Sequence, residues 1–487
     1  MLILREPKRF RFMEALVAVL ICVGSLGVAI AAAAEGGAAQ IVKERSDGMM
    51  EYTAMSCRKH SAVLTDFGGV GDGKTLNTKA FQAAVANLSK YAKDGGAELI
   101  VPPGKWLTGS FSLTSHFTLF LHKDATILAS QNEADYPLTD PLPSFGREKG
   151  FPDGRFSSLI TGSNLVDVVI TGNNGTIDGQ GKVWWDKFEA KKLKAQRPLL
   201  IEILHATDLQ ITNITLINSP MWHIHPVYSR NVLVKGVTII APVEVPNTDG
   251  VNPNSCTNTR VEDCYIVSGD DCVAVKSGWD QYGIKYGMPT KQLVVRRLTC
   301  ISPNSAMIAL GSEMSGGLED IRIDDVTAFD TESAVRIKTA PGRGGYVKDI
   351  YVRNMKLDNM GYVFWVSGKY KTHPDDGFDP KALSKIKNIN FRDVVGKNVN
   401  MSGSFDAFPD DRFTGFCLSN VTLTESQHPK ELQWNCTDVE GVWSDVSPKP
   451  CSLLHEKGTA KCTYPTDKLP IESVDLKTCT VKGVSSS

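Results

Sequence analysis

The stretches LQITNITL at residues 209–216 and VLVKGVTI at residues 232–239 share one pattern of apolar and polar side chains. Each has an apolar residue at the third and sixth positions and a turn-forming residue, Asn213 or Gly236, at the fifth. Two short strands that meet at a polar corner would give this spacing. The same template recurs in five further segments, TRVEDCYI (259–266), LVVRRLTC (293–300), IRIDDVTA (321–328), IYVRNMKL (350–357) and INFRDVVG (389–396).

The seven segments begin 23 to 39 residues apart, an imperfect period that is typical of stacked coils. They are rich in Val and Ile and lack the helical spacing of apolar residues, which favours strands. We therefore predict an all-β chain folded as a single-stranded parallel β-helix, each coil adding a rung about 4.8 Å above the last. A β-propeller or a sandwich of hairpins is disfavoured, because regular Asn-Gly or Asp-Gly turns are missing.

A solenoid grows by adding coils, so the 487 residues do not require several domains. We predict a β-helix domain over residues 57–410 and a cysteine-rich C-terminal end, residues 411–487, packed on it. The segment 66–88 begins with a Gly-rich turn and continues as an amphipathic helix, which is expected to cap the open N-terminal end. Its apolar residues at helical spacing are Phe81, Ala84, Val85 and Leu88.

The N-terminal 34 residues have the pattern of a secretory signal. Basic residues precede an apolar run from Ala15 to Ala34 that ends in small side chains. The run is longer than an ordinary signal core, so residues 1–34 form either a cleaved signal peptide or a single membrane anchor, with residues 35–56 as an extension. In both cases the domain would lie outside the cell.

The cysteine content agrees with an extracellular protein. Ten of the eleven cysteines lie beyond the signal, an even number available for pairing. Cys256, Cys264 and Cys272 recur every eight residues, wider than zinc ligands, so disulfides or buried thiols are favoured. The formal net charge of −1 gives no reason to expect nucleic acid. Six Asn-x-Ser/Thr sites fit glycosylation, at Asn87, Asn174, Asn213, Asn400, Asn420 and Asn435.

Polar stretches interrupt the successive repeats, and their spacing places them on neighbouring coils. Asn247 and Asp249 are two residues apart, as are Arg336 and Lys338, so in an extended strand the side chains of each pair would leave the same face. Asp270 follows Asp249 by about one coil, and Arg336 lies about two coils further on, so these side chains are expected to line one groove. Asp270 and Asp271 would face opposite sides of a regular strand, so we expect a bulge or turn at Gly269. The stretches are Asn247-Thr248-Asp249, Gly269-Asp270-Asp271, Gly311-Ser312-Glu313 and Arg336-Ile337-Lys338.

Clustered carboxylates raise one another's pKa values, which suits acid–base chemistry. A protonated carboxyl group donates to a leaving oxygen while an ionised neighbour activates water, as in glycoside hydrolysis. Arg336 and Lys338, two residues apart, would suit a substrate that carries carboxylates of its own. An acidic polysaccharide meets both requirements. The alternative for each Asp is a turn-capping role, which is how we interpret Asp263, Asp325 and Asp393.

From about Asp66 to Val394 the chain resembles glycoside hydrolase family 28, the polygalacturonases and related pectin hydrolases. The resemblance rests on Asp66-Phe67-Gly68 and on the motifs at 247–249, 269–271 and 336–338. It implies a right-handed parallel β-helix and hydrolysis of α-1,4-galacturonosyl linkages in pectin with inversion. Inversion predicts carboxyl groups roughly 6.5 to 9.5 Å apart across the cleavage point.

The resemblance also implies roles for single residues. Asp270 is similar to the general acid, and Asp249 and Asp271 to the carboxylates that activate water. Arg336 and Lys338 are similar to the clamp for a galacturonate carboxylate, and Asn247 would orient the substrate or a carboxylate. We expect no cofactor and no metal, and a monomer whose partner is the acidic polysaccharide of the plant cell wall, with membrane contact only if the anchor is retained.

The chain departs from the family where Gly-His-Gly is usual, because Asn304-Ser305-Ala306 stands there. A hydroxyl at Ser305 cannot hold a positive charge, so an altered rate or pH dependence is expected. His223 and His225 alternate on one strand and are interpreted as a structural pair near Trp222. His373, in a loop-like stretch, is a further candidate for the missing group.

Several residues and functions keep open alternatives. Trp279, Tyr282, Trp365 and Tyr370 would stack on sugar rings or, more commonly, pack in the protein. Glu313 has either a turn-capping or a functional role. A pectin-binding protein with little activity and a rhamnogalacturonan-type hydrolase are the alternatives to a polygalacturonase. Three carboxylates favour hydrolysis, because a binder of an anionic polymer gains nothing from them.

Overall fold

The computed structural model describes residues 49–146, 151, 154–409 and 411–482. The expected signal or anchor lies outside these residues, as does most of the extension over residues 35–56, whose last part forms the strand β1. Across the described ranges, no helix is long and apolar enough to span a membrane.

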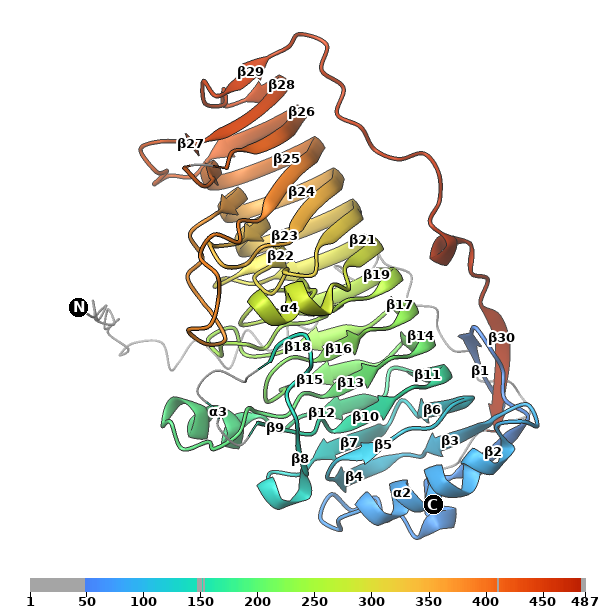
Figure 1. Cartoon of the computed structure of the whole chain (residues 1–487). Helices are drawn as coiled ribbons and strands as arrows, with labels where there is room; N and C mark the ends of the chain where they lie inside the picture. Colours follow the sequence, from blue (N-terminus) through green and yellow to red (C-terminus); the bar gives the residue numbers. More distant parts are fainter. Residues whose placement is uncertain (1–48, 147–150, 152–153, 410, 483–487) are drawn as a thin grey trace, which may run out of the picture. The chain divides into compact units, whose positions relative to one another are not determined.

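Most of the regular secondary structure in the described chain is β-strand (Figure 1). Its helices are α2 (Thr78–Leu88), α3 (Lys182–Glu189) and α4 (Asp280–Tyr286), with short 3-10 turns η2 (Leu64–Phe67), η3 (Ser89–Tyr91), η4 (Glu133–Asp135) and η5 (Pro470–Ser473). The strands of the first half are β1 (Met49–Ala54), β2 (His60–Val63), β3 (Ala97–Val101), β4 (Gly104–Thr108), β5 (Phe111–Ser112), β6 (Phe117–Leu121), β7 (Ala125–Ala129), β8 (Leu138–Thr139), β9 (Arg155–Phe156), β10 (Ile160–Ser163), β11 (Val166–Gly172), β12 (Thr176–Asp178), β13 (Ile201–Leu204), β14 (Thr207–Thr212), β15 (Thr215–Ile217), β16 (Ile224–Val227), β17 (Arg230–Lys235) and β18 (Thr238–Ile240). Those of the second half are β19 (Thr257–Val267), β20 (Val273–Val275), β21 (Thr290–Ile301), β22 (Ala306–Gly311), β23 (Leu318–Lys338), β24 (Tyr346–Ser367), β25 (Lys385–Asp406), β26 (Phe413–Glu425), β27 (Trp434–Thr437), β28 (Val439–Ser447), β29 (Leu454–Glu456) and β30 (Lys477–Lys482).

Strands of successive coils pair in parallel and stack into a solenoid (Figure 1). The register places equivalent core residues above one another, as with Ile211, Val234 and Val261 on β14, β17 and β19. Among the described strands, β1 with β30 and β8 with β9 are the antiparallel pairs. The predicted parallel β-helix is confirmed.

The repeat template has a direct structural meaning. Its fifth residue adopts a left-handed backbone conformation in all seven copies, with φ between 48° and 61°. Asn, Asp and Gly tolerate this conformation better than other residues, and it turns the chain from one strand into the next. The exception is Arg297, whose side chain is held by Asp263 at 2.5 Å. The third and sixth residues are buried in every copy, so the polar corner and the apolar interior are confirmed.

Helix α2 covers the N-terminal end of the solenoid, as predicted (Figure 1). Its four apolar residues at helical spacing are buried, and Phe81 stacks on Phe111 of β5 with ring centroids 4.4 Å apart. The helix therefore shields the apolar interior where the stack of coils begins.

Parallel pairing does not end at residue 410, where we placed the boundary of the β-helix. Strand β26 pairs with β25, β28 with β26, and β29 with β28. The segments FCLSNVTL (416–423) and GVWSDVSP (441–448) carry the same template, with Asn420 and Asp445 in the left-handed conformation at the fifth position. The periodic signal was thus present beyond residue 410, and these residues add coils.

Four disulfides join eight cysteines of the described chain, and Cys256 and Cys264 are buried free thiols. Both expected states therefore occur. The disulfides are Cys57–Cys479, Cys272–Cys300, Cys417–Cys462 and Cys436–Cys451.

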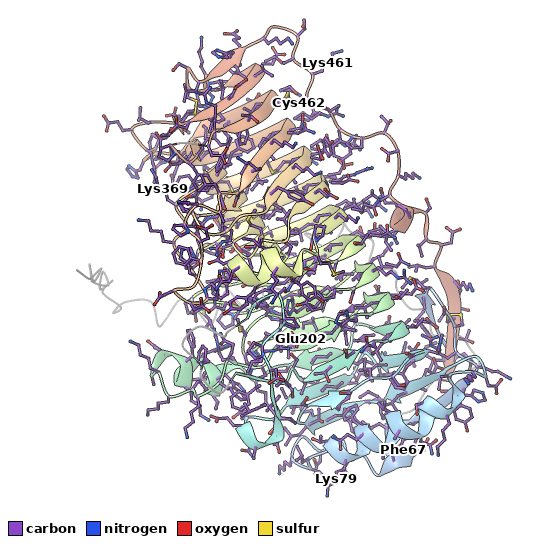
Figure 2. The ribbon with its side chains drawn as sticks, in the orientation of Figure 1. Phe67, Lys79, Glu202, Lys369, Lys461 and Cys462 are labelled. Atoms are coloured by element: carbon purple, nitrogen blue, oxygen red, sulfur yellow. A yellow bond between two sulfur atoms is a disulfide. The ribbon has the colours of Figure 1, made fainter. Side chains whose placement is uncertain are left out.

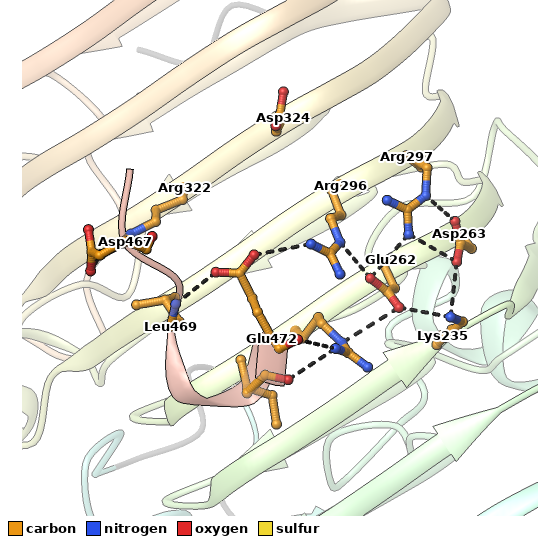
Figure 3. A network of polar contacts seen from close by, with 12 residues as sticks. Lys235, Glu262, Asp263, Arg296, Arg297, Arg322, Asp324, Asp467, Leu469 and Glu472 are labelled. Carbon is orange, nitrogen blue, oxygen red and sulfur yellow. Dashed lines mark hydrogen bonds and ion pairs between the residues drawn. The ribbon is translucent and has the colours of Figure 1, made fainter. Parts of the chain in front are cut away.

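After β29 the chain returns along the outside of the coils as a segment that we call the C-terminal strap, residues 457–482 (Figures 1 and 3). It begins near Cys462, which is bonded to Cys417 and labelled in Figure 2. Asp467 then pairs with Arg322 of β23, and Glu472 with Arg296 of β21 at 3.1 Å. The strap ends as β30, which pairs with β1.

Candidate active site

The parallel register sorts the side chains of the central coils into rows. Ile224, Val251, Val273, Ile308, Val335 and Phe364 lie in line on successive rungs. Asp249 and Asp271 each lie two residues before the member of this line on their own rung. Lys276 and Lys338 each lie three residues after it. The register therefore sets a row of carboxylates beside a row of ammonium groups.

The three predicted aspartates come together. One oxygen of each carboxylate lies within 4.8 Å of one oxygen of the other two. These distances between nearest oxygens are shorter than the separation of roughly 6.5 to 9.5 Å that inversion predicts between whole carboxyl groups. Asp270 and Asp271 reach one site because the chain bends at Gly269 and Asp270, between β19 and β20. Gly269 is required there by close packing, since a Cβ would lie 2.0 Å from the carbonyl oxygen of Val245.

Asp270 is the most exposed of the three carboxylates. Its Oδ2 accepts a hydrogen bond from the backbone N–H of Asn247 at 3.0 Å, and its Oδ1 accepts one from the N–H of Asp271 at 2.9 Å. These two bonds fix the orientation of the carboxyl group while one side stays open to solvent.

Asp271 is buried and ionised. Its Oδ2 accepts a hydrogen bond from Lys338 at 2.5 Å, and its Oδ1 accepts bonds from Ser305 Oγ at 2.6 Å and from the N–H of Ala306 at 3.1 Å. Burial alone would raise the pKa of Asp271, but the charge of Lys338 and these hydrogen bonds hold it below its usual value.

Asp249 is equally buried, but its contacts offset the cost of burying a negative charge less well than those of Asp271 do. Its Oδ2 accepts a hydrogen bond from Asn252 at 3.1 Å, and the ammonium group of Lys276 lies 4.0 Å away. Burial and the negative charge of Asp270 raise the pKa of Asp249 well above its usual value. Asp249 is therefore protonated more readily than the neighbouring Asp271, whose pKa is shifted in the opposite direction.

The two predicted cationic residues have partners within the protein. Lys338 is bonded to Asp271, so it anchors a carboxylate of the site. Arg336 donates from Nη1 to Glu332 at 2.9 Å, and its guanidinium stacks 3.8 Å from the ring centre of Trp365. Both lie on β23 and point to the same face, as their spacing predicted.

Asn247 lies in a turn and not in the extended strand that we expected. Its side chain accepts a hydrogen bond at 2.7 Å from Arg197, which is buried and was not predicted from the sequence. Burial lowers the pKa of Arg197 to about 10, against the attraction of Asp249 and Asp270. Arg197 thus supplies positive charge to the cluster from a loop before β13.

Lys276 is a second cation that was not predicted. Its ammonium group forms an ion pair with Glu313 at 2.7 Å. Burial alone would raise the pKa of Glu313, but the charge of Lys276 lowers it to about 2. Lys276 could have been identified from the register of the repeats, because that register places it in the same row as Lys338. Glu313 is therefore the ion-pair partner of a lysine beside Asp249.

The matches to known proteins agree with this geometry. The model of glycosyl hydrolases family 28 matches residues 108–451, which include every residue of the site. The chain belongs to this family. It is 62% identical over 433 residues to a probable polygalacturonase from Vitis vinifera, an alignment that covers 88% of each chain.

Family-28 structures share the fold. An exopolygalacturonase from Thermotoga maritima superposes with a TM-score of 0.66 at 26% identity, over 76% of this chain and 88% of that one. A polygalacturonase from Erwinia carotovora has a TM-score of 0.62 at 23% identity, over 82% and 99%. The second likeness shows the fold alone.

Ser305 stands where the family histidine is usual, and the structure shows what it contacts. Its hydroxyl donates to Asp271 Oδ1 at 2.6 Å. A neutral donor thus replaces a group able to carry charge, and the positive charge next to Asp271 comes from Lys338.

The three candidate histidines have other partners. His223 is buried and its Nδ1 lies 3.0 Å from the backbone oxygen of Asp249, while burial lowers its pKa to about 4. His225 contacts Glu202 at 2.9 Å, in a buried group around Glu202, which is labelled in Figure 2. His373 binds Asp280 at 2.5 Å. These contacts support structural roles.

The aromatic candidates differ in what they contact. Trp365 is stacked on Arg336 and, with ring centroids 4.3 Å apart, on Tyr362. Tyr370 lies 5.6 Å from the ammonium group of Lys338. The Trp279 indole and the Tyr282 hydroxyl donate to Thr372 O and to Asp375. These aromatic side chains therefore support cations and loops of the protein.

We expect Ser305→Ala to move the acid limb of the pH–activity profile upward by up to about one pH unit, because the hydroxyl helps to hold the pKa of Asp271 low. Fewer molecules would then have Asp271 ionised at acid pH. The measurement is kcat/KM across pH for both enzymes. Ser333→Ala is the matched control, since the buried Ser333 hydroxyl has no hydrogen-bond partner among the described residues. An acid limb that stays in place would contradict the prediction.

Proposed function

We propose that this family-28 enzyme hydrolyses α-1,4-galacturonosyl linkages in pectin by acid–base chemistry of three carboxyl groups. The observation that carries the proposal is the convergence of Asp249, Asp270 and Asp271 within 4.8 Å, next to Lys338. The polygalacturonase names of the relatives agree with this substrate. A site whose carboxyl groups have pKa values shifted in opposite directions, as Asp249 and Asp271 do, suits general acid and general base catalysis.

We propose that Asp270 donates a proton to the glycosidic oxygen as its bond to the anomeric carbon breaks. Asp249 and Asp271 hold a water molecule, whose oxygen bonds to that carbon as its proton passes to a carboxylate. Burial and the charge of Asp270 raise the pKa of Asp249, which places an uncharged carboxyl group beside the ionised Asp271 more readily than a second carboxylate. Asn247 and Arg197 keep this part of the site in place.

Arg336 and Lys338 are proposed to bind the carboxylate of the galacturonate beside the scissile bond. Both sit at the C-terminal end of β23, one rung beyond Ala309 and Gly311 of β22. Their positive charges would also favour an anionic chain over a neutral one.

We test the function by incubating the secreted domain with polygalacturonate, with a rhamnogalacturonan backbone in parallel, and counting new reducing ends. Proton NMR of the first products should show the β anomer, because inversion of an α linkage gives it. The α anomer would contradict inversion, a result that the short carboxylate separation makes worth checking. Binding of polygalacturonate with no new reducing ends would favour the pectin-binding alternative.

We also propose that the enzyme acts as a monomer on the plant cell wall. Four disulfides support an oxidising extracellular location. Fractionation of tissue that expresses the full chain distinguishes a soluble wall protein from an anchored one, and sizing of the purified domain gives its oligomeric state.

A further inference from the structure

Glu332 is a further carboxylate near the site, and neither the motifs nor the proposed reaction assigns it a role. It lies four residues before Arg336 on β23, and its Oε2 accepts the hydrogen bond from Arg336 Nη1 at 2.9 Å. Its backbone N–H donates to the carbonyl oxygen of Ser302, and the Ser302 hydroxyl donates to the carbonyl oxygen of Asp270. Glu332 thus lies two rungs beyond Asp270 and Asp271 and is linked to them through Ser302.

Arg336 is held in place from its other face. Its guanidinium stacks on Trp365, Trp365 stacks on Tyr362, and the ammonium group of Lys430 lies 4.5 Å from the ring centre of Tyr362. This column of stacked side chains leaves the guanidinium little freedom to swing away. The buried Nε of Arg336 has no hydrogen-bond partner among the described residues.

A guanidinium that is mostly buried is costly without an anionic partner. In the substrate-free enzyme the partner is Glu332, whose side chain is 31% exposed. When an ionised galacturonate binds, its carboxylate and that of Glu332 compete for the same guanidinium and repel each other. When a methyl-esterified galacturonate binds, it brings no charge, and Glu332 keeps Arg336 paired.

We propose that Glu332 is an internal carboxylate that occupies Arg336 and thereby makes the site tolerant of methyl-esterified galacturonate. The proposal rests on the proposed function, because it concerns the substrate carboxylate of that reaction. Glu332 is a specificity-determining residue in this scheme, and it takes no part in proton transfer.

Acidity changes this competition in a defined direction. Burial and the charges of Asp271 and Asp270 raise the pKa of Glu332, against the opposing charges of Arg336 and Lys338. Glu332 therefore becomes neutral at a higher pH than an ordinary glutamate. Protonation frees Arg336, so acid conditions favour binding of any uronate that is still ionised.

The test measures binding in the Asp270→Asn background, so that no substrate is consumed. Titration calorimetry compares a galacturonate oligomer with its methyl ester of equal length, with and without Glu332→Gln. We expect Glu332→Gln to tighten binding of the ionised oligomer roughly tenfold relative to the ester, with the larger gain at higher pH. Glu425→Gln, which removes an exposed acid from the end of β26, is the control and should leave the ratio unchanged.

Three outcomes overturn the inference. An unchanged ratio in Glu332→Gln would show that Glu332 does not compete with the substrate carboxylate. A weaker preference for the ionised oligomer would show that Glu332 only supports Arg336. If neither oligomer binds any variant, and the enzyme with Asp270 intact cuts neither, the proposed function itself fails. Binding without any change in selectivity removes the role of Glu332 alone.

Discussion

Asp270→Asn is expected to lower kcat on polygalacturonate by roughly 10²- to 10⁴-fold, the loss typical of a missing general acid. An amide has the shape of the carboxyl group and its oxygen still accepts a hydrogen bond from Asn247 N–H, but it cannot give up a proton to the leaving oxygen. Binding of a galacturonate oligomer should persist, because Arg336 and Lys338 are unchanged. Reducing-end counts and calorimetry measure the two effects separately.

The matched control for Asp270→Asn is Asp325→Asn. Asp325 is an exposed corner residue of β23 with φ of 51°, a conformation that Asn adopts readily, so activity should stay within twofold, about the scatter of a neutral surface change. An Asp270→Asn enzyme with a tenth or more of the wild-type kcat would rule out Asp270 as the acid, and attention would turn to Asp249, whose raised pKa lets it hold a proton.

Lys338→Met is expected to cost both activity and stability. Removing the ammonium group leaves the buried Asp271 without its charged partner, a change that typically destabilises a protein by about 3–5 kcal/mol. Activity should fall by roughly 10²-fold or more, because the carboxylate of Asp271 would be largely protonated and a clamp residue is lost. Thermal unfolding and kcat/KM measured side by side give the two effects.

The pH dependence of this stability loss has a defined sign. In the wild type the pKa of Asp271 is depressed, so its ionised form contributes stability above the unfolded pKa of about 3.9, and this contribution is lost as pH falls through the folded value. In Lys338→Met that contribution is absent near neutral pH. The difference in unfolding free energy should therefore keep its full value from pH 7 down to about pH 4 and shrink below it, as Asp271 of the wild type becomes protonated.

Lys348→Met is the control for Lys338→Met. Lys348 pairs with Glu319 at 2.8 Å, but both side chains are partly exposed, and such pairs contribute under about 1 kcal/mol. A Lys338→Met enzyme as stable as this control, or one with the same stability loss at every pH, would mean that the contact between Lys338 and Asp271 does not hold the carboxylate ionised.

The repeat template predicted the fold because both of its features are local. Each copy of eight residues contains a left-handed corner at the fifth position and a buried residue on either side of it. The same corner recurs at Asn420 and Asp445, beyond the last copy that we counted. The aspartates were predicted from their spacing along the repeats, since Asp270 follows Asp249 by about one coil.

The rest of the site depends on contacts across coils, which no local pattern encodes. Arg197 reaches Asn247 from a loop 50 residues earlier, and Lys276 lies beside Asp249 only through the register of neighbouring rungs. Asn247 and Asp249 were assigned to a regular strand, yet they lie in a turn and its exit. The short distances between the carboxylate oxygens likewise depend on the bend at Gly269, and the size of this bend cannot be predicted from the sequence.

The C-terminal strap affects how the molecule unfolds. In an open stack each coil touches only its neighbours, so coils are lost one at a time from either end. Here Cys57–Cys479 and Cys417–Cys462 tie the first coil to the last ones, and Arg322 and Arg296 hold the strap between them. Unfolding coil by coil from the ends is therefore blocked, and the coils should unfold as one cooperative unit. We expect few partly unfolded ends that extracellular proteases could cleave.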